Sequence, residues 1–378
     1  MLRKITLCLC MLILSITPVK GVELKLAPNA SASILIDAST NKVLYASNEQ
    51  EKLYPASTTK IMTMILMFEA VHNGQLRWDD MLTCSEHASS MGGSQVYLET
   101  GEQMCLSDLF KSIAIASAND ACVVVGERIA GNHEAFVDMM NEKAKQLKLV
   151  CTHFENATGL HDDNHYTCAY DLSIMASYLI EIGGDKLLET TSLYDSYIRE
   201  GSKKFWLVNT NKLLKSYKGV DGLKTGYTKE AGYCMVVTAK KNGLRLIGVV
   251  LKEKEPKVRN NELIQLLDYG FSLFETHILF KTDEVIEKKD VKNGKESKAN
   301  IVSVKDVIYV KKKHEDINIS YTLKYNDLIA PIHKGDIVGT LILKDNKNIL
   351  GTYELTVDKD IEAMTFIEVF HSYIKLIV

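Results

Sequence analysis

Ser57 and Lys60 lie three residues apart, directly ahead of an apolar run from Ile61 to Phe68. A proline before this stretch and a glycine after it predict one helix from about Ser57 to His72. Residues three apart share a helix face, so the Ser57 hydroxyl and the Lys60 amine can meet. A serine needs a base to become a nucleophile, and burial lowers the pKa of a lysine enough for that task. Taken alone, Ser-x-x-Lys is a common pattern, and a helix start followed by a surface lysine is its more frequent explanation.

Two later triplets carry further chemistry. Ser117-Ala118-Asn119 precedes an apolar helix, where a hydroxyl can relay a proton and an amide can hold a substrate amide. Lys224-Thr225-Gly226 offers a cation and a hydroxyl to a carboxylate, and its glycine lets an extended substrate approach the backbone. Taken singly, the first triplet is also a common helix cap and the second a polar turn leading into a strand. The three motifs in this order, about 60 and about 105 residues apart, together indicate a serine acyl-transfer site.

The elements around these motifs alternate between strands and helices. We expect a hairpin of Ser33–Asp37 and Lys42–Tyr45, and a second of Tyr233–Ala239 and Leu244–Leu251 with Asn242-Gly243 at its turn. Between the hairpins the pattern is helical, with helices predicted from Leu106, over Asp120–Ile129, over Ala135–Leu147, and over Asp171–Ile180 with a stop at Gly183-Gly184; a helix over Val258–Phe274 follows the second hairpin. This order predicts an α+β fold, in which helices flank an antiparallel sheet and a helical lobe is inserted into it.

A second region begins near Thr276 and is followed by a different terminus. Its charged segment Glu284–Asn300 predicts a solvated loop or an edge hairpin. Short alternating runs then predict a small all-β domain over residues 276–359; the runs are Val307–Val310, Ile317–Tyr321, Ile337–Leu343 and Tyr353–Val357. Over residues 360–378, apolar residues recur at helical spacing from Phe366 to Val378 and predict an amphipathic helix. Such a helix either packs on the β domain or lies on a membrane surface.

Residues 1–21 have the pattern of a signal peptide. Arg3 and Lys4 precede twelve largely apolar residues, and a small residue, Gly21, follows where cleavage is expected. Removal of this segment takes away three basic residues and no acid, which changes the formal net charge from -3 to -6. We therefore expect an exported, mildly acidic protein whose catalytic domain spans residues 22–275. The charge balance does not favour a nucleic-acid partner.

Cysteine and histidine give little support for a metal centre. Six cysteines follow the predicted signal peptide, and none forms a Cys-x-x-Cys pair. We expect most of them to be small buried residues, and disulfide pairing stays open. The segment His161–His165 contains possible ligands, but its loop-like setting favours a structural role, so no metal is predicted there.

The three motifs resemble those of the penicillin-binding proteins and β-lactamases. The chain is most similar to the low-molecular-weight D-alanyl-D-alanine carboxypeptidases, and among them to the sporulation-type members of Gram-positive spore formers. The stretches that carry the resemblance are Tyr54–Thr63, Ser85–Ser94, Ile115–Ala121 and Asp221–Thr228. The family's penicillin-binding, transpeptidase-like fold, its small β domain and its terminal helix on the outer face of the cytoplasmic membrane match the order found here.

The resemblance implies a role for each site residue and no cofactor. Ser57 is the nucleophile acylated by the penultimate D-alanine of a peptidoglycan stem peptide, Lys60 the base, and Ser117 the proton relay to the leaving D-alanine. Asn119 binds the peptide amide, and Lys224 and Thr225 hold the terminal carboxylate beside Gly226. The backbone N–H groups of Ser57 and Tyr227 form the oxyanion hole, and Arg259 is a weaker carboxylate contact. β-Lactams are expected as covalent inhibitors.

Three other activities use related machinery. A class A β-lactamase deacylates through a Glu-x-x-Leu-Asn segment, which Glu155-Asn156-Ala157-Thr158-Gly159 does not match. A non-catalytic penicillin sensor is expected to lack a catalytic position, and none is lost here. A D,D-transpeptidase or endopeptidase stays open, because the same acyl-enzyme reacts with either water or an amine.

Overall fold

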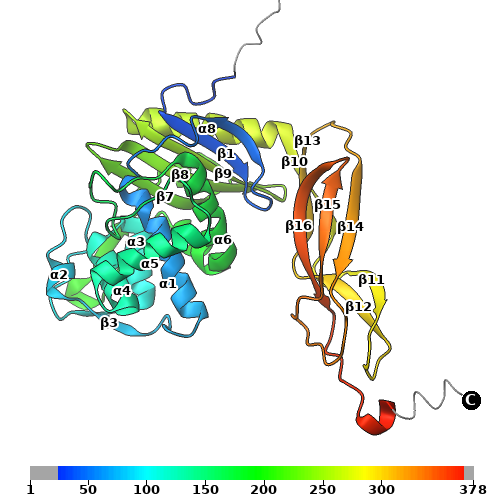
Figure 1. Cartoon of the computed structure of the whole chain (residues 1–378). Helices are drawn as coiled ribbons and strands as arrows, with labels where there is room; N and C mark the ends of the chain where they lie inside the picture. The colour runs from blue at the N-terminus through cyan, green and yellow to red at the C-terminus, as the bar shows by residue number, and fades with distance from the viewer. Residues whose placement is uncertain (1–23, 370–378) are drawn as a thin grey trace, which may run out of the picture.

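The computed structural model describes residues 24–369 and consists of a larger α+β domain followed by a smaller β domain (Figure 1). The predicted signal peptide, residues 1–21, lies outside the described residues. So do residues 370–378 of the predicted terminal helix.

A five-stranded antiparallel sheet forms the centre of the larger domain, with the strand order β2-β1-β9-β8-β7. Its strands are β1 (Ala32–Asp37), β2 (Val43–Ser47), β7 (Val220–Thr228), β8 (Gly232–Lys241) and β9 (Leu244–Glu253). Both predicted hairpins are present, and β1 pairs with β9, so the two ends of the domain's sequence meet in one sheet. The α+β class with an antiparallel sheet is therefore confirmed.

The sheet is buried on both faces. Ile34 and Ile36 of β1 enter the core under the helical lobe, whereas Leu35 enters a second core on the opposite face. Helix α8 (Pro256–Leu273) covers that second face through Leu263 and its neighbours. Because successive side chains of a strand point to opposite faces, burial on both sides explains the nearly continuous apolar runs of β8 and β9.

The helical lobe is inserted between β2 and β7, as predicted (Figure 1). Its helices are α1 (Lys60–His72), α2 (Glu86–Ser89), α3 (Leu106–Ala116), α4 (Asn119–Ala130), α5 (His133–Gln146), α6 (Ala169–Thr191) and α7 (Leu213–Ser216). The helix predicted from Ser57 begins as a 3-10 turn, Ala56–Thr59, and becomes α-helical at Lys60. Ten of the thirteen residues of α1 are buried, so it is the central helix of the lobe.

The predicted stop at Gly183-Gly184 is confirmed as a break in helical geometry, but a second helical segment follows it directly. Gly184 does leave helical geometry, with φ 48° and ψ -141°, but the chain resumes a helix at once and α6 continues to Thr191. Leu187 packs against Gly183, where a Cβ atom would lie 2.6 Å from the Leu187 Cβ atom. The glycines therefore produce a kink, because tertiary packing holds the next turn in place.

Several strands were not predicted. Lys224-Thr225-Gly226 lies within β7 instead of in a turn before a strand. Two short antiparallel pairs, β3 (Met81–Thr83) with β4 (Gln103–Cys105) and β5 (Asp195–Ile198) with β6 (Phe205–Val208), border the helical lobe. These strands have only three or four residues, too few for a clear alternation of apolar and polar side chains.

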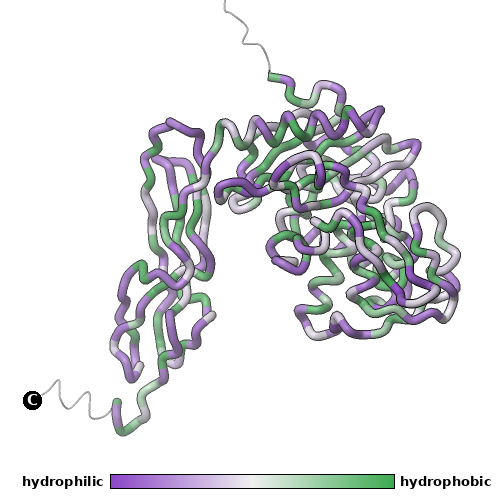
Figure 2. The backbone as a smooth tube through the Cα atoms, turned by 180° about the vertical axis from the view of Figure 1, so that it is seen from behind, coloured by the Kyte–Doolittle hydropathy of each residue, from purple (hydrophilic) through white to green (hydrophobic). Residues whose placement is uncertain are grey.

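The smaller domain is all-β, as predicted. Strands β10 (Phe274–Phe280) and β13 (Val307–Lys312) form a two-stranded ribbon that continues from α8. The main sheet has the order β11-β12-β16-β15-β14, made of β11 (Val285–Asp290), β12 (Lys298–Ser303), β14 (Ile319–Tyr325), β15 (Gly339–Asp345) and β16 (Asn348–Val357). The charged segment Glu284–Asn300 forms the edge hairpin β11–β12. Hydrophilic and hydrophobic residues alternate along these strands in Figure 2, consistent with a one-sided core.

The described part of the terminal helix begins with a capping box. The backbone N–H of Thr365 donates to the Glu368 carboxylate at 2.7 Å, and the Glu368 N–H donates to Thr365 Oγ1 at 3.4 Å. Residues 366–369 are helical, and Phe366 is 85% exposed. Within residues 24–369, no helix is both long enough and apolar enough to cross a membrane.

Candidate active site

Ser57 lies in the 3-10 turn at the start of α1, and Lys60 lies one turn further on. The Lys60 Nζ atom is 2.8 Å from Ser57 Oγ, so the predicted pair is brought together. Ala56, just before the serine, has a φ of 49°, which a residue with a Cβ atom rarely adopts. Such backbone strain persists only where the surrounding structure enforces it.

Lys60 is fully buried among uncharged partners. Besides Ser57 Oγ, its Nζ atom lies 2.7 Å from Asn119 Oδ1 and 2.7 Å from the Thr158 carbonyl oxygen. Burial lowers the pKa of Lys60 to about 8, although nearby Cys122 and Asp120 favour its charged form. A neutral amine has two N–H donors and one lone pair. Two donors for the Asn119 and Thr158 oxygens leave the lone pair for the Ser57 hydroxyl, which is the arrangement of a base.

Asn119 is the first residue of α4, and hydrogen bonds to its side-chain amide and its backbone fix it from three sides. Its Oδ1 accepts from Lys60, its Nδ2 donates to the Gly92 carbonyl at 2.7 Å, and its backbone N–H donates to the Ser94 carbonyl at 2.7 Å. One N–H of the Nδ2 group suffices for Gly92, which leaves the other for a ligand. Asn119 therefore connects the base to the loop around Ser94.

Ser117 and Lys224 form the opposite wall of the cleft. Ser117 ends α3 in the left-handed conformation with φ 64°, which turns its side chain away from the helix. The Lys224 Nζ atom donates to Ser117 Oγ at 3.0 Å and to the Thr225 carbonyl at 3.0 Å. Burial, and to a lesser extent the nearby Lys60, holds the pKa of Lys224 well below its usual value. An anionic ligand in the cleft would stabilise the charged form of this lysine.

Strand β7 is the edge strand of the sheet and runs past the nucleophile. The Thr225 hydroxyl donates to Thr210 Oγ1 at 2.7 Å, so its oxygen is held in place. At Gly226, a Cβ atom would lie 2.9 Å from both the Pro55 carbonyl oxygen and the Ser57 backbone nitrogen. Glycine is therefore required for the close approach of β7 to the Ser57 turn.

A cleft of about 490 Å³ opens between these walls. Its lining includes Ser57, Ser117, Thr225, Tyr227 and Arg259. The Tyr227 side chain is 56% exposed and stacks on Tyr233, with ring centroids 4.4 Å apart. The Arg259 guanidinium donates only to the Cys234 carbonyl and the Asn260 side chain among the described residues, so it has no carboxylate partner there. All nine predicted site residues thus lie in or directly beside one cleft.

One further segment supports the nucleophile and was not predicted as part of the site. The Thr158 carbonyl accepts from Lys60, and the neighbouring Gly159 lies so close to Ala56 that a Cβ atom would be 1.8 Å from its carbonyl oxygen. Thr210, the partner of Thr225, was also missed. Thr158 acts through its backbone, so no residue type in the sequence indicates its role.

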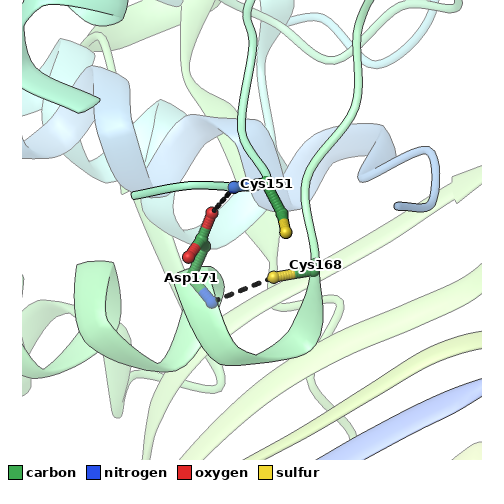
Figure 3. Close-up of side chains that lie close together, drawn as sticks. All are labelled: Cys151, Cys168 and Asp171. Carbon is green, nitrogen blue, oxygen red and sulfur yellow. Dashed lines mark hydrogen bonds between the residues drawn. The ribbon is translucent and has the colours of Figure 1, made fainter. Parts of the chain in front are cut away.

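The histidines of the segment His161–His165 do not converge on one point. His165 is buried, its Nδ1 accepts from the Glu155 N–H at 3.2 Å, and its Nε2 lies 2.8 Å from Thr59 Oγ1. Burial lowers the pKa of His165 to about 4, so it is neutral and donates to Thr59. His161 instead packs edge-on against Tyr54. The group in the described residues with metal-ligand spacing is a different one, Cys151, Cys168 and Asp171 (Figure 3).

Comparison with known proteins gives consistent matches for both domains. Residues 21–255 match the peptidase S11 family model, described as D-alanyl-D-alanine carboxypeptidase. Residues 274–363 match the C-terminal domain of penicillin-binding protein 5.

Individual relatives agree over most of their length. D-alanyl-D-alanine carboxypeptidase DacF of Bacillus subtilis is 45% identical over 91% of this chain and 88% of its own. DacC of Escherichia coli is 34% identical over 89% and 86%. Penicillin binding protein 5 of Haemophilus influenzae superposes with a TM-score of 0.71 at 30% identity, over 88% of this chain and 98% of that one. Penicillin-binding protein D2 of Listeria monocytogenes, solved in an ampicillin-bound form, has a TM-score of 0.58 at 34% identity over 64% and 98%.

Proposed function

The chain belongs to the D-alanyl-D-alanine carboxypeptidases of peptidase family S11, and from this we propose that Ser57 is its nucleophile and Lys60 its base. The observation that carries the proposal is the buried Lys60 amine, 2.8 Å from Ser57 Oγ. With its pKa lowered to about 8, a useful fraction of this amine is neutral near pH 7 and can take the serine proton.

In the proposed acylation, Ser57 Oγ attacks the carbonyl carbon of the penultimate D-alanine while its proton passes to Lys60. The carbonyl oxygen becomes an oxyanion, which the backbone N–H groups of Ser57 and Tyr227 stabilise. Each such donor contributes roughly 3–4 kcal/mol to the transition state. The close approach of Gly226 to the Ser57 nitrogen supports this pairing. The peptide C–N bond then breaks, and Ser117 delivers the proton to the leaving D-alanine. Water finally hydrolyses the ester on Ser57.

The charges of the cleft support a substrate with a free carboxylate. Lys224, Thr225 and Arg259 would bind that carboxylate, since they offer two cations and a hydroxyl. Asn119 would orient the peptide amide through its second Nδ2 hydrogen. An extended peptide can pair with the edge strand β7, as in other cases where a ligand adds a strand to a sheet.

We also propose that β-lactams acylate Ser57 and that their release is slow. A class A β-lactamase deacylates through a glutamate that positions water. Here the Glu155 carboxylate pairs with His153 at 3.0 Å, and both side chains are partly exposed. Glu155 is thus occupied elsewhere, which supports the carboxypeptidase over the lactamase.

The decisive experiment measures D-alanine released from a tripeptide ending in D-Ala-D-Ala. The wild-type protein is expected to release it, whereas Ser57→Ala is not. Ser39→Ala, a change in an exposed turn, is the matched control and should behave like the wild type. Penicillin labelling of Ser57 without D-alanine release would favour the transpeptidase or the sensor instead. If the protein is not labelled by penicillin and also releases no D-alanine, the assignment of Ser57 as the nucleophile is refuted.

We further propose where the protein acts. The basic residues and apolar run at the N-terminus support export, and the periodic apolar residues from Phe366 to Val378 support attachment to the outer face of the cell membrane. A function in spore formation is supported only by the resemblance to sporulation-type members. Deletion of the gene, followed by analysis of spore-wall peptides, would test it.

A further inference from the structure

Cys151 and Cys168 form a pair that the catalytic proposal does not use. Their sulfur atoms and a carboxylate oxygen of Asp171 all lie within 4.8 Å of one another. In Figure 3 the two sulfur atoms lie close together, Cys151 on a loop segment and Cys168 at the start of α6. Both thiols are free in this structure. We propose that Cys151 and Cys168 form a disulfide in the oxidised protein, which closes the loop that supports the nucleophile.

The backbone register places the two cysteines opposite each other. His153 and Tyr166 exchange both backbone hydrogen bonds, at 2.9 and 3.0 Å, as an antiparallel pair. One residue outward, the hydroxyls of Thr152 and Thr167 are 2.8 Å apart. One residue further, the same register pairs Cys151 with Cys168. The Cys151 N–H donates to Asp171 and not across this pair, but the two sulfur atoms lie within 4.8 Å of each other. Opposed residues of antiparallel chains have Cα atoms about 4.5–5.5 Å apart, within the range for disulfides.

Asp171 orders this pair, but with it the possible ligands are too few for a structural zinc site. Its Oδ2 atom accepts from the Cys151 N–H at 2.8 Å and from the Thr152 hydroxyl at 2.7 Å. Its own backbone N–H donates to Cys168 Sγ at 3.4 Å, where that cysteine caps α6. The Asp171 carboxylate therefore holds the Cys151 backbone, and the Asp171 backbone N–H holds the Cys168 sulfur. The Oδ1 atom of Asp171 is buried and has no hydrogen-bond partner among the described residues, but only three possible ligands converge here. A structural zinc site uses four protein ligands, so a disulfide accounts for the arrangement better than a zinc ion does.

The two thiols differ in accessibility to solvent, and this difference sets the order in which they react when the disulfide forms. Cys151 is partly exposed, whereas Cys168 is fully buried and burial raises the pKa of its thiol. The Cys151 thiolate attacks a small disulfide such as oxidised glutathione and releases one thiol. The Cys168 sulfur then displaces the second thiol. Two protein thiols are oxidised by two electrons, and one reagent disulfide is reduced to two thiols.

The cross-link would act on the active site through the loop that it closes. The loop carries the Thr158 carbonyl that accepts from Lys60, and Gly159, which lies against Ala56. It also carries His165, which holds Thr59. Closing this loop removes conformations from the unfolded chain, as well as from the partly opened native state.

The test compares the full protein after treatment with oxidised glutathione and after treatment with a reducing agent. No lysine or arginine lies between Lys148 and Lys186, so trypsin leaves both cysteines on one peptide. In the oxidised sample this peptide is expected to be lighter by two hydrogen atoms, and cleavage after Glu155 should separate its halves only after reduction. The melting temperature of the oxidised protein should be higher by about 5 °C. This readout does not depend on peptidase activity.

Variants and metal analysis complete the test. Cys151→Ser should abolish the difference between oxidised and reduced protein, and Cys105→Ser, at another partly exposed cysteine, should preserve it. Thiols at residues 151 and 168 that can still be alkylated after oxidation and unfolding would overturn the proposal. A stoichiometric zinc ion that protects both thiols would also overturn it, in favour of a metal site.

Discussion

At the residue scale, the site depends on Lys60, a lysine whose pKa is lowered by burial. Lys60 is enclosed by one hydroxyl, one amide oxygen and one carbonyl oxygen, and none of these is a full negative charge. Desolvation therefore dominates its pKa. Lys60 in turn lowers the pKa of Lys224, the second buried lysine, although burial is the larger cause there.

This environment predicts the pH dependence of acylation. Because only the neutral Lys60 amine accepts the serine proton, the rate of penicillin acylation should rise with pH through about 8 and then level off. Below that value the rate should fall about tenfold per pH unit. Stopped-flow acylation between pH 5 and 10 measures this. Lys60→Arg, which stays charged, should show no acylation at any pH; a flat wild-type profile would contradict the role of Lys60.

Gly226→Ala is predicted to slow acylation strongly without unfolding the protein. The new Cβ atom would meet two backbone atoms at 2.9 Å, and neither can move without moving the Ser57 turn. We expect a loss of about 10²-fold or more in acylation rate, as for a lost oxyanion donor. Gly92→Ala is the matched control, because a Cβ atom at Gly92 has nothing within 4 Å. Equal rates for both variants would refute the close-approach argument.

The site residues could be predicted from the sequence because their chemistry resides in side chains, and these side chains occur in a characteristic order. Thr158 could not be predicted from the sequence, since its contribution is a backbone carbonyl that any residue could offer. Thr210 was missed for a related reason: a hydroxyl that holds another hydroxyl has no spacing signature.

At the scale of elements, the loop from Phe154 to His165 is as much a part of the site as α1. It contacts the nucleophile turn through a carbonyl, a glycine and a buried histidine. The fold class and most elements could be predicted from apolar periodicity. Strand β7 could not be predicted in this way, because Lys224 and Gly226, which belong to the site, interrupt its apolar pattern. The helical segment that follows the break at Gly184 could not either, because Leu187 packs there against Gly183.

Gly159→Ala tests whether this loop supports the nucleophile turn. Its φ of 82° and the 1.8 Å approach to Ala56 predict lost acylation and a lowered melting temperature. Gly101→Ala introduces similar backbone strain at φ 81° but meets nothing within 4 Å. Only Gly159→Ala should lose penicillin labelling at 25 °C, measured beside calorimetry. If both variants label equally, the contact with Ala56 is not needed.

At the scale of the whole molecule, the two domains are joined more firmly than by a single linker. The Lys42 side chain donates to the Val310 carbonyl at 2.8 Å, and the Val310 side chain is part of the core beneath α8. Val310 belongs to β13, which pairs with β10 over its length. The smaller domain therefore extends from the larger one in a defined direction (Figure 1).

The proposed membrane attachment predicts a simple difference between two forms of the protein. The chain from Val22 to Val378 should sediment with phospholipid vesicles, whereas a chain ending at Thr365 should stay in solution. Release of D-alanine from a soluble tripeptide should be equal for both, because the cleft lies in the other domain. If the shorter chain sediments equally well, the terminal helix is not the attachment.

The ribbon of β10 and β13 affects how far the cleft lies from the far end of the smaller domain. Two hydrogen-bonded chains resist twisting where a single chain would rotate freely, so the smaller domain keeps one direction relative to the larger one. The ten residues of β16 alone extend roughly 33 Å. If the far end rests on a bilayer, the cleft is held at one height above it. The enzyme would then select wall peptides by their distance from the cell surface, a choice that no residue in the cleft makes.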